Sequence, residues 1–177
     1  MSSGEKKKRT KNPGIRNGSL TRFMRAHSGI HGGRVSSNAV ATMKGITEQA
    51  VTKLGEKVAK ALQLAKKKTV TINTIRYIIE EHPCKGWDAG LLEYGIPKKN
   101  KGDRHVISVQ SCLRTFAKGC PLGEGNHSIA KDAKEALAVL IEGFVAKLTT
   151  DASKITEVSE RVTISSKDVI AASKIRG

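Results

Sequence analysis

This sequence contains few aromatic side chains. They make up 3% of the 177 residues, so core filling must come from Val, Ile, Leu and Ala. Small aliphatic residues favour helices that pack through narrow apolar stripes, and they argue against an aromatic-rich β-sandwich. The composition therefore predicts an all-α fold.

Cysteines are also scarce, and the groupings typical of catalysis or metal binding are missing. The three cysteines are Cys84, Cys112 and Cys120, and their spacing matches neither a disulfide framework nor a zinc site. No Ser/His/Asp or Cys/His set typical of nucleophilic catalysis is discernible. The glycines in 119–125 do not form a phosphate-binding loop, because no Gly-Lys-Ser/Thr follows them. We therefore predict reduced thiols, no metal, no cofactor and no enzymatic activity.

Long hydrophobic runs are absent as well. No stretch approaches the roughly 18 consecutive apolar residues that a membrane-spanning helix needs. The first residues lack the pattern of a secretion signal, so we do not expect secretion.

Acidic residues are few in comparison with basic ones. The chain has 32 Lys and Arg against 16 Asp and Glu, a net charge of +16. A charge this high needs a polyanionic partner, with nucleic acid the first candidate and an anionic membrane surface the second. The charge is +5 in residues 1–18, +7 in 19–83, +2 in 84–104 and +2 in 105–177. The first half is therefore expected to contact a polyanion more strongly than the second.

Two segments of the chain share one order of predicted elements. Residues 19–83 and 105–177 each contain a short helix, a loop, a long proline-free helix, a β-branched link and a last short helix. Residues 1–18 are interpreted as a disordered basic tail, and residues 84–104 as a connector with a short helix. The expected bounds are 19–28, 36–66, 69–71 and 74–81 in the first segment, 88–94 in the connector, and 107–118, 129–159, 161–164 and 167–174 in the second.

The β-branched links suggest how the two segments align. Val70-Thr71-Ile72 and Val162-Thr163-Ile164 match at an offset of 92 residues. This pattern indicates an internal duplication of architecture with little residue identity.

Short helix, loop, long helix, loop, short helix is the order of the histone fold, and local strings strengthen the likeness. The string at residues 36–43, Ser-Ser-Asn-Ala-Val-Ala-Thr-Met, resembles the start of the central helix of histone 2B. The string at residues 137–140, Leu-Ala-Val-Leu, resembles a run in histone 2A. The chain thus resembles a histone doublet, similar to a shortened member of those of Marseillevirus-type giant DNA viruses.

This resemblance, which covers about residues 19–177, implies a fold and a function. Two tandem histone folds would clasp each other within one chain as a handshake pseudo-dimer. The protein would bend and compact duplex DNA in a nucleosome-like particle, together with a second histone pair or doublet of the 3/4 type. The implied location is the virion and the viral factory or host nucleus, and otherwise nuclear chromatin. No membrane or small-molecule partner is implied.

The resemblance also implies the DNA contacts. In a handshake the first loop of one copy lies beside the second loop of the other, and the short first helices meet between these sites. His127 stands where the family has an arginine. The implied contacts in the first copy are Arg22, Arg25, Arg34, Val35, Ser36, Ser37, Lys66, Lys67, Lys68 and Thr69. Those in the second copy are Arg114, Lys118, His127, Ser128, Arg161, Val162 and Thr163.

Two other functions compete with DNA packaging. A histone-fold subunit of a transcription-regulatory complex fits the weakly basic second half, although the net charge of +16 argues against it. An RNA-binding accessory protein is the third possibility. The scarcity of aromatic residues argues against it, because single-strand binding relies on base stacking.

Overall fold

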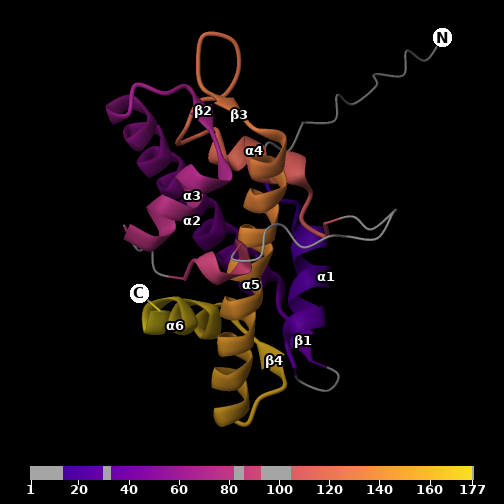
Figure 1. The fold of residues 1–177 in the computed structure, drawn as a ribbon. Helices are drawn as coiled ribbons and strands as arrows, with labels where there is room; N and C mark the ends of the chain where they lie inside the picture. The colour runs from indigo at the N-terminus through magenta and orange to yellow at the C-terminus, as the bar shows by residue number, and fades with distance from the viewer. Residues whose placement is uncertain (1–13, 30–32, 82–85, 93–104, 177) are drawn as a thin grey trace, which may run out of the picture.

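The computed structural model of this protein describes residues 14–29, 33–81, 86–92 and 105–176. The predicted all-α architecture and the predicted order of elements are confirmed (Figure 1). The elements are α1 (Asn17–His27), β1 (Arg34–Val35), α2 (Ser37–Leu64), β2 (Thr69–Val70), α3 (Ile72–Glu81), the 3-10 helix η1 (Ala89–Leu92), α4 (Val109–Phe116), β3 (Ser128–Ile129), α5 (Lys131–Val158), β4 (Thr163–Ile164) and α6 (Ser166–Arg176). Much of the predicted connector, including residues 93–104, lies outside the described residues.

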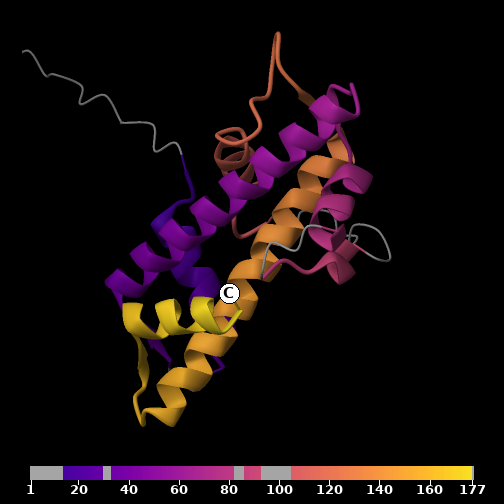
Figure 2. The same ribbon diagram turned by 90° about the vertical axis from the view of Figure 1, so that its left-hand side faces the viewer.

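Two long helices form the centre of the molecule. Helices α2 and α5 have 28 residues each and pack against one another. The short helices α1 and α4 lie on one side of this pair and α3 lies on the other (Figures 1 and 2). Because each half contributes one long helix, neither half could bury its apolar stripe alone.

The short strands join the two halves at both ends of the molecule (Figure 1). Strand β1 pairs in parallel with β4, and β2 pairs in parallel with β3. At one end the Arg34 N–H donates to the Val162 carbonyl over 3.1 Å, and at the other the Ser128 N–H donates to the Lys68 carbonyl over 2.9 Å. Each first loop therefore pairs with the second loop of the other half, which is the expected handshake.

The structure corrects the predicted alignment of the halves. Strand β2 begins at Thr69 and β4 at Thr163, an offset of 94 residues rather than 92. Helix α4 begins 92 residues after α1 and β3 begins 94 residues after β1, so the two additional residues lie between the start of α4 and β3. Burial decides the register, because Val70 and Ile164 are the fully buried residues of their strands.

The predicted tail of residues 1–18 extends too far. Residues 1–13 lie outside the described residues, but Ile15 is completely buried and its N–H donates to Glu48 of α2 over 3.1 Å. The second half repeats this arrangement, since the buried Ile107 donates to Glu142 of α5 over 3.2 Å. A single isoleucine in a polar segment carries no periodic signal, which is why the sequence did not reveal it.

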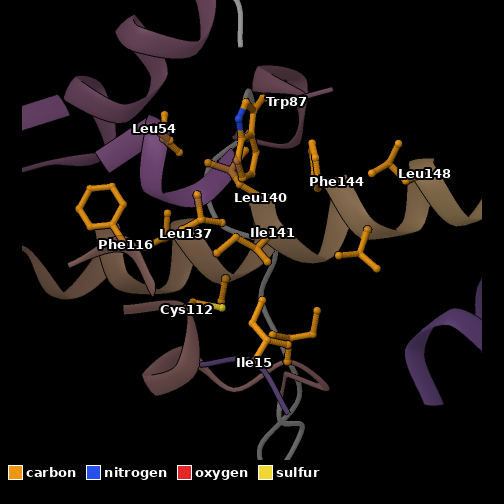
Figure 3. Close-up of a cluster of buried hydrophobic side chains, with 14 of the residues drawn as sticks. Ile15, Leu54, Trp87, Cys112, Phe116, Leu137, Leu140, Ile141, Phe144 and Leu148 are labelled. Atoms are coloured by element: carbon orange, nitrogen blue, oxygen red, sulfur yellow. The ribbon is translucent and has the colours of Figure 1, made fainter. Parts of the chain in front are cut away.

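The core is aliphatic at its centre and includes a stacked aromatic pair at its edge. Leu137, Leu140 and Leu148 project from α5 into it (Figure 3). Trp87 stacks on Phe144 with ring centroids 4.8 Å apart.

A close crossing of helices fixes where α4 sits on α2. A Cβ on Gly119 would lie 2.0 Å from the Thr52 carbonyl oxygen, and one on Gly55 would lie 2.6 Å from the Phe116 carbonyl oxygen. Both contacts are with backbone atoms that cannot rotate away. Glycine is therefore required here for the two chain segments to touch.

Candidate nucleic-acid interface

The end of α2 presents three lysines. The helix closes with two backbone hydrogen bonds, from the Lys66 N–H to the Gln63 carbonyl over 3.1 Å and from the Lys67 N–H to the Leu62 carbonyl over 2.9 Å. Lys66 adopts the left-handed conformation with φ of 53°, which is typical of helix C-termini. This turn leaves the side chains of Lys66, Lys67 and Lys68 exposed. No ion pair joins them to a carboxylate within the described residues.

This cluster lies beside the first loop of the second half. The hydroxyls of Thr69 and Ser128 are 2.9 Å apart, which links β2 to β3. The three lysines, Lys60 and His127 line one groove there. The two halves thus form one basic surface at this end, and we call Lys66–Lys68, Thr69, His127 and Ser128 the β2–β3 end.

The structure changes the assignment of His127. Ser128 is the first residue of β3, as Arg34 is of β1, so Ser128 rather than His127 is the counterpart of Arg34. His127 closes a small loop, because its N–H donates to the Pro121 carbonyl over 3.1 Å and its carbonyl accepts from the Gly123 N–H over 3.0 Å. The loop between α4 and β3 projects beyond the strands (Figure 1).

The other end pairs β1 with β4, and here one predicted contact is engaged within the protein. Arg34 is exposed. Arg161 instead forms a two-pronged ion pair with Asp168 of α6, with N–O distances of 2.6 and 3.1 Å. The Arg161 side chain remains 43% exposed, whereas that of Asp168 is 2% exposed. The main contact of Arg161 is therefore the ion pair that stabilises the junction of β4 and α6, while part of its side chain remains exposed to solvent.

The charge state of Asp168 reflects this network. Burial acts to raise the pKa of its carboxyl, but hydrogen bonds from Arg161 and from the backbone and hydroxyl of Ser165 outweigh it and lower the pKa to about 2. The same pair raises the pKa of Arg161. The pair is thus ionised at neutral pH.

The remaining predicted contacts divide by exposure. Val35 is 7% exposed, so its side chain is part of the core and its backbone alone can face a ligand. Val162 is 62% exposed, and Ser36 caps α2 by accepting a hydrogen bond from the Ala39 N–H over 3.1 Å. Exposed side chains are found at Arg22 and Arg25 of α1, Ser37, Arg114 of α4 and Lys118, while Ser36 and Thr163 are half-buried.

Sequence reasoning missed two cations at the β2–β3 end. Lys60 lines the groove with Lys67, and Lys134 of α5 lines an adjacent groove with Arg114 and Ser128. In the sequence Lys60 lies seven residues before Lys67, near the end of the predicted helix 36–66, and this position could have identified it. Nothing in the sequence places Lys134 beside α4, because that contact depends on the fold.

The described residues offer no site for metal chemistry and no reactive thiol. No group of three or more His, Cys, Asp or Glu capable of holding a metal occurs among them. Burial raises the pKa of the Cys112 thiol to about 12, with a contribution from the Glu142 charge, and that of Cys120 to about 11. Cys84 lies outside the described residues. Within the same ranges, no helix is long and apolar enough to span a membrane.

Comparisons with known proteins agree with this architecture. Residues 99–175 match the family model of the core histone domain, which describes histones 2A, 2B, 3 and 4. The chain is 33% identical over 88 residues to the B-2 subunit of nuclear transcription factor Y from Oryza sativa subsp. japonica. That match covers 48% of each chain, so this chain spans about half the length of the curated relative.

A solved structure extends the likeness to both halves. The crystal structure of the histone from Methanopyrus kandleri aligns with a TM-score of 0.63 over 89% of this chain and 92% of that one, at 18% identity. At this identity the match shows the fold. The chain therefore has an all-α histone fold, in which two tandem copies form a handshake and residues 99–175 match the core histone domain.

Proposed function

We propose that this protein binds duplex DNA without sequence preference, and that it bends and compacts DNA in a nucleosome-like particle. The observation that carries the proposal is the β2–β3 end, where three exposed lysines and a serine from the other half form one surface. Exposed lysine side chains on such a surface suit two neighbouring phosphates of one DNA strand. Arg34 at the opposite end and the exposed arginines of α1 and α4 would extend the path, and contacts of this kind use phosphates and DNA flexibility.

The distribution of ion pairs supports this proposal. Three acidic residues of the described ranges, Asp88, Asp151 and Asp168, are paired with Lys or Arg side chains. Lys66–Lys68 have no such partner there. The surface that we assign to DNA therefore carries positive charge that no described carboxylate pairs with.

We further propose the finer identity that the sequence suggested. The chain would be a histone doublet of the Marseillevirus type, non-enzymatic, with a basic tail, a histone 2B-like copy in 19–83, a connector and a histone 2A-like copy in 105–177. It would act in the virion and the viral factory or host nucleus.

A second histone pair of the 3/4 type is the proposed protein partner. Both long helices end in exposed apolar side chains, Leu64 at 78% and Val158 at 87% exposure. Tyr77 of α3 is 53% exposed and lines a groove with Leu64. The groove lined by Leu64 and Tyr77 is an exposed apolar surface that suits a protein partner.

Nuclease digestion of long DNA reconstituted with the protein tests the packaging function. The digestion is run with and without a 3/4-type histone pair. We expect a discrete protected fragment when the pair is present. A smear in both cases, despite tight binding, would contradict a nucleosome-like particle.

Salt dependence tests the mode of binding. If the protein neutralises six to ten phosphates, its affinity should fall roughly 10³–10⁵-fold between about 50 and 200 mM salt. Competition with single-stranded RNA at fixed salt provides the control, and we expect duplex DNA to be preferred. A shallow slope or a preference for RNA would contradict the proposed surface.

The second candidate function is a subunit of a transcription-regulatory complex. The likeness to the rice protein, whose name is that of a transcription factor component, favours it. Binding measured on several unrelated duplexes separates the two functions. Equal affinities support packaging, whereas a large preference for one sequence supports regulation.

A further inference from the structure

A groove with an aromatic floor lies away from the surface that we assign to DNA. It is a cavity of about 520 Å³ between α2, α5 and α6. Trp87, Phe144 and Leu148 form its floor, with exposures of 9%, 4% and 2% (Figure 3). None of its lining residues comes from α1 or α4. A ligand in this groove would therefore leave the two helices that we assign to DNA uncovered.

The wall on α2 changes from apolar to cationic along the helix. Ile46 and Ala50 are half-buried, and Lys53 and Lys57 follow at one and two further turns of the same face. From Ile46 to Lys57 the wall is roughly 16 Å long at 1.5 Å per residue. This length fits a short peptide segment of about three helical turns.

The charged side chains at the rim of the groove favour a ligand of negative charge. Among the described residues that line the groove, Lys53, Lys57 and Arg176 are basic and Glu56 is acidic. Arg176 also pairs with Asp151. A second copy of this chain carries +16 and is disfavoured, as is the basic segment 1–13. Duplex DNA is excluded by shape, because a rigid duplex cannot reach a recessed apolar floor.

The floor also holds an unsatisfied donor. The Trp87 indole N–H is buried and has no hydrogen-bond partner within the described part of the chain. A buried donor without a partner costs free energy, which an oxygen of a bound chain could recover. This donor adds to the preference for a ligand that presents carbonyl or carboxylate oxygens.

We propose that this groove binds an acidic amphipathic segment of a partner protein. Its large apolar side chains would pack on Trp87, Phe144 and Leu148, and its carboxylates would face Lys53 and the end of α6. This is the helix-in-groove mode of recognition, in which apolar anchors supply affinity and flanking charges supply selectivity. The proposal is independent of DNA binding.

Trp87 provides the measurement, because it is the single tryptophan of the chain. The full-length protein is titrated with a synthetic peptide of about 15 residues that has Leu at helical spacing and Glu elsewhere. A matched peptide has Lys in place of Glu. We expect a saturable change in Trp emission with the acidic peptide, weaker at high salt, and none with the basic peptide. Equal responses to both peptides, or none to either, would overturn the proposal.

Two variants locate the binding. Lys53→Glu should weaken the acidic peptide roughly fivefold, whereas Lys44→Glu makes the same charge change on α2 outside the groove and should have little effect. Ala50→Arg should block the wall and abolish binding, with the fold checked by circular dichroism. Equal losses in Lys53→Glu and Lys44→Glu, or normal binding by a folded Ala50→Arg protein, would reject this groove.

Discussion

The second loops of the two halves have the same backbone and use their charges differently. Lys66 and Glu160 occupy equivalent left-handed turns, with φ of 53° and 54°, and each loop leads into a strand paired with the other half. At the next position the first half has Lys67, exposed and unpaired with any described carboxylate, and the second has Arg161, paired with Asp168. The counterpart of Asp168 in the first half is Thr74, whose N–H donates to the Thr71 hydroxyl over 3.2 Å.

This difference shows how a duplicated fold can separate two tasks. A cation at one position either stabilises the loop by pairing with α6 or remains available to an outside anion. The neutral pair of Thr71 and Thr74 holds the first loop with hydrogen bonds, and so leaves its lysines without described acidic partners. We therefore expect the first half to provide most of the DNA affinity.

The largest expected effect comes from removing the basic loop. Changing Lys66, Lys67 and Lys68 together to Ala should weaken duplex DNA binding roughly 10- to 100-fold. The slope of the logarithm of the binding constant against the logarithm of the salt concentration should decrease in magnitude by about 2 to 3. Binding isotherms at several salt concentrations measure both quantities. The control variant changes Lys44, Lys53 and Lys174 to Ala, which removes the same charge elsewhere. If Arg161→Ala lost as much affinity as the triple variant, the comparison between the loops would fail.

The next effect concerns stability in the second half. Asp168→Ala removes the buried partner of Arg161 and leaves the Ser165 N–H without its acceptor. We expect a loss on the order of 2 kcal/mol in the free energy of unfolding, measured with urea. Thr74→Ala at the equivalent position is the control, and it should cost clearly less. Equal losses at the two positions would show that the ion pair has no special role.

The same pair predicts a pH dependence. The pKa of Asp168 is lowered to about 2, so its contribution to stability is complete above the ordinary carboxyl pKa of about 4 and is lost as pH falls towards 2. The stability difference between the wild type and Asp168→Asn should therefore narrow from pH 5 to pH 2. Urea unfolding at each pH measures it, and a constant difference would contradict the shifted pKa.

A transplant of the pair sharpens the comparison further. The double variant Lys67→Arg with Thr74→Asp should create in the first loop the pair that holds the second. We expect a few-fold loss of DNA affinity and a gain in stability of up to about 1 kcal/mol. The double variant Lys67→Arg with Thr74→Asn keeps the charge unpaired and is the control. Unchanged DNA affinity in the Asp variant would mean that pairing does not withdraw the cation from DNA.

The smallest effect tests the turn itself. Glu160→Gly should stabilise the protein by roughly 0.5–1 kcal/mol, because glycine adopts positive φ without steric cost. Thermal unfolding measures this gain, with Glu160→Ala as the control that should not show it. A destabilised glycine variant would indicate that the Glu160 side chain has a structural role.

Much of the fold was predictable because it depends on local patterns. The periodic apolar positions predicted both long helices to within about two residues at each end, and the β-branched links predicted β2 and β4. The buried position of Ile15 and the pairing of Arg161 with Asp168 were not predicted. Both depend on contacts between elements, and neither leaves a repeating signal in the sequence.

The candidate site likewise has a part that the sequence predicted and a part that it did not. The basic loop of Lys66–Lys68 was evident as a run of charge, and it is exposed as expected. The equivalence of Ser128 with Arg34 was missed, because the segment from the start of α4 to β3 is two residues longer than that from the start of α1 to β1, and strand pairing sets the register.

The sequence alone predicted the helical periodicity, the strongly basic first half and the repeated order of elements. Those features are properties of single segments, since spacing and charge are set by neighbouring residues. Only the folded structure decides which first loop pairs with which second loop. It also decides which arginine pairs with a carboxylate and where the groove with the aromatic floor forms. Each of these results depends on residues far apart in the chain, which the clasp of α2 and α5 brings into contact.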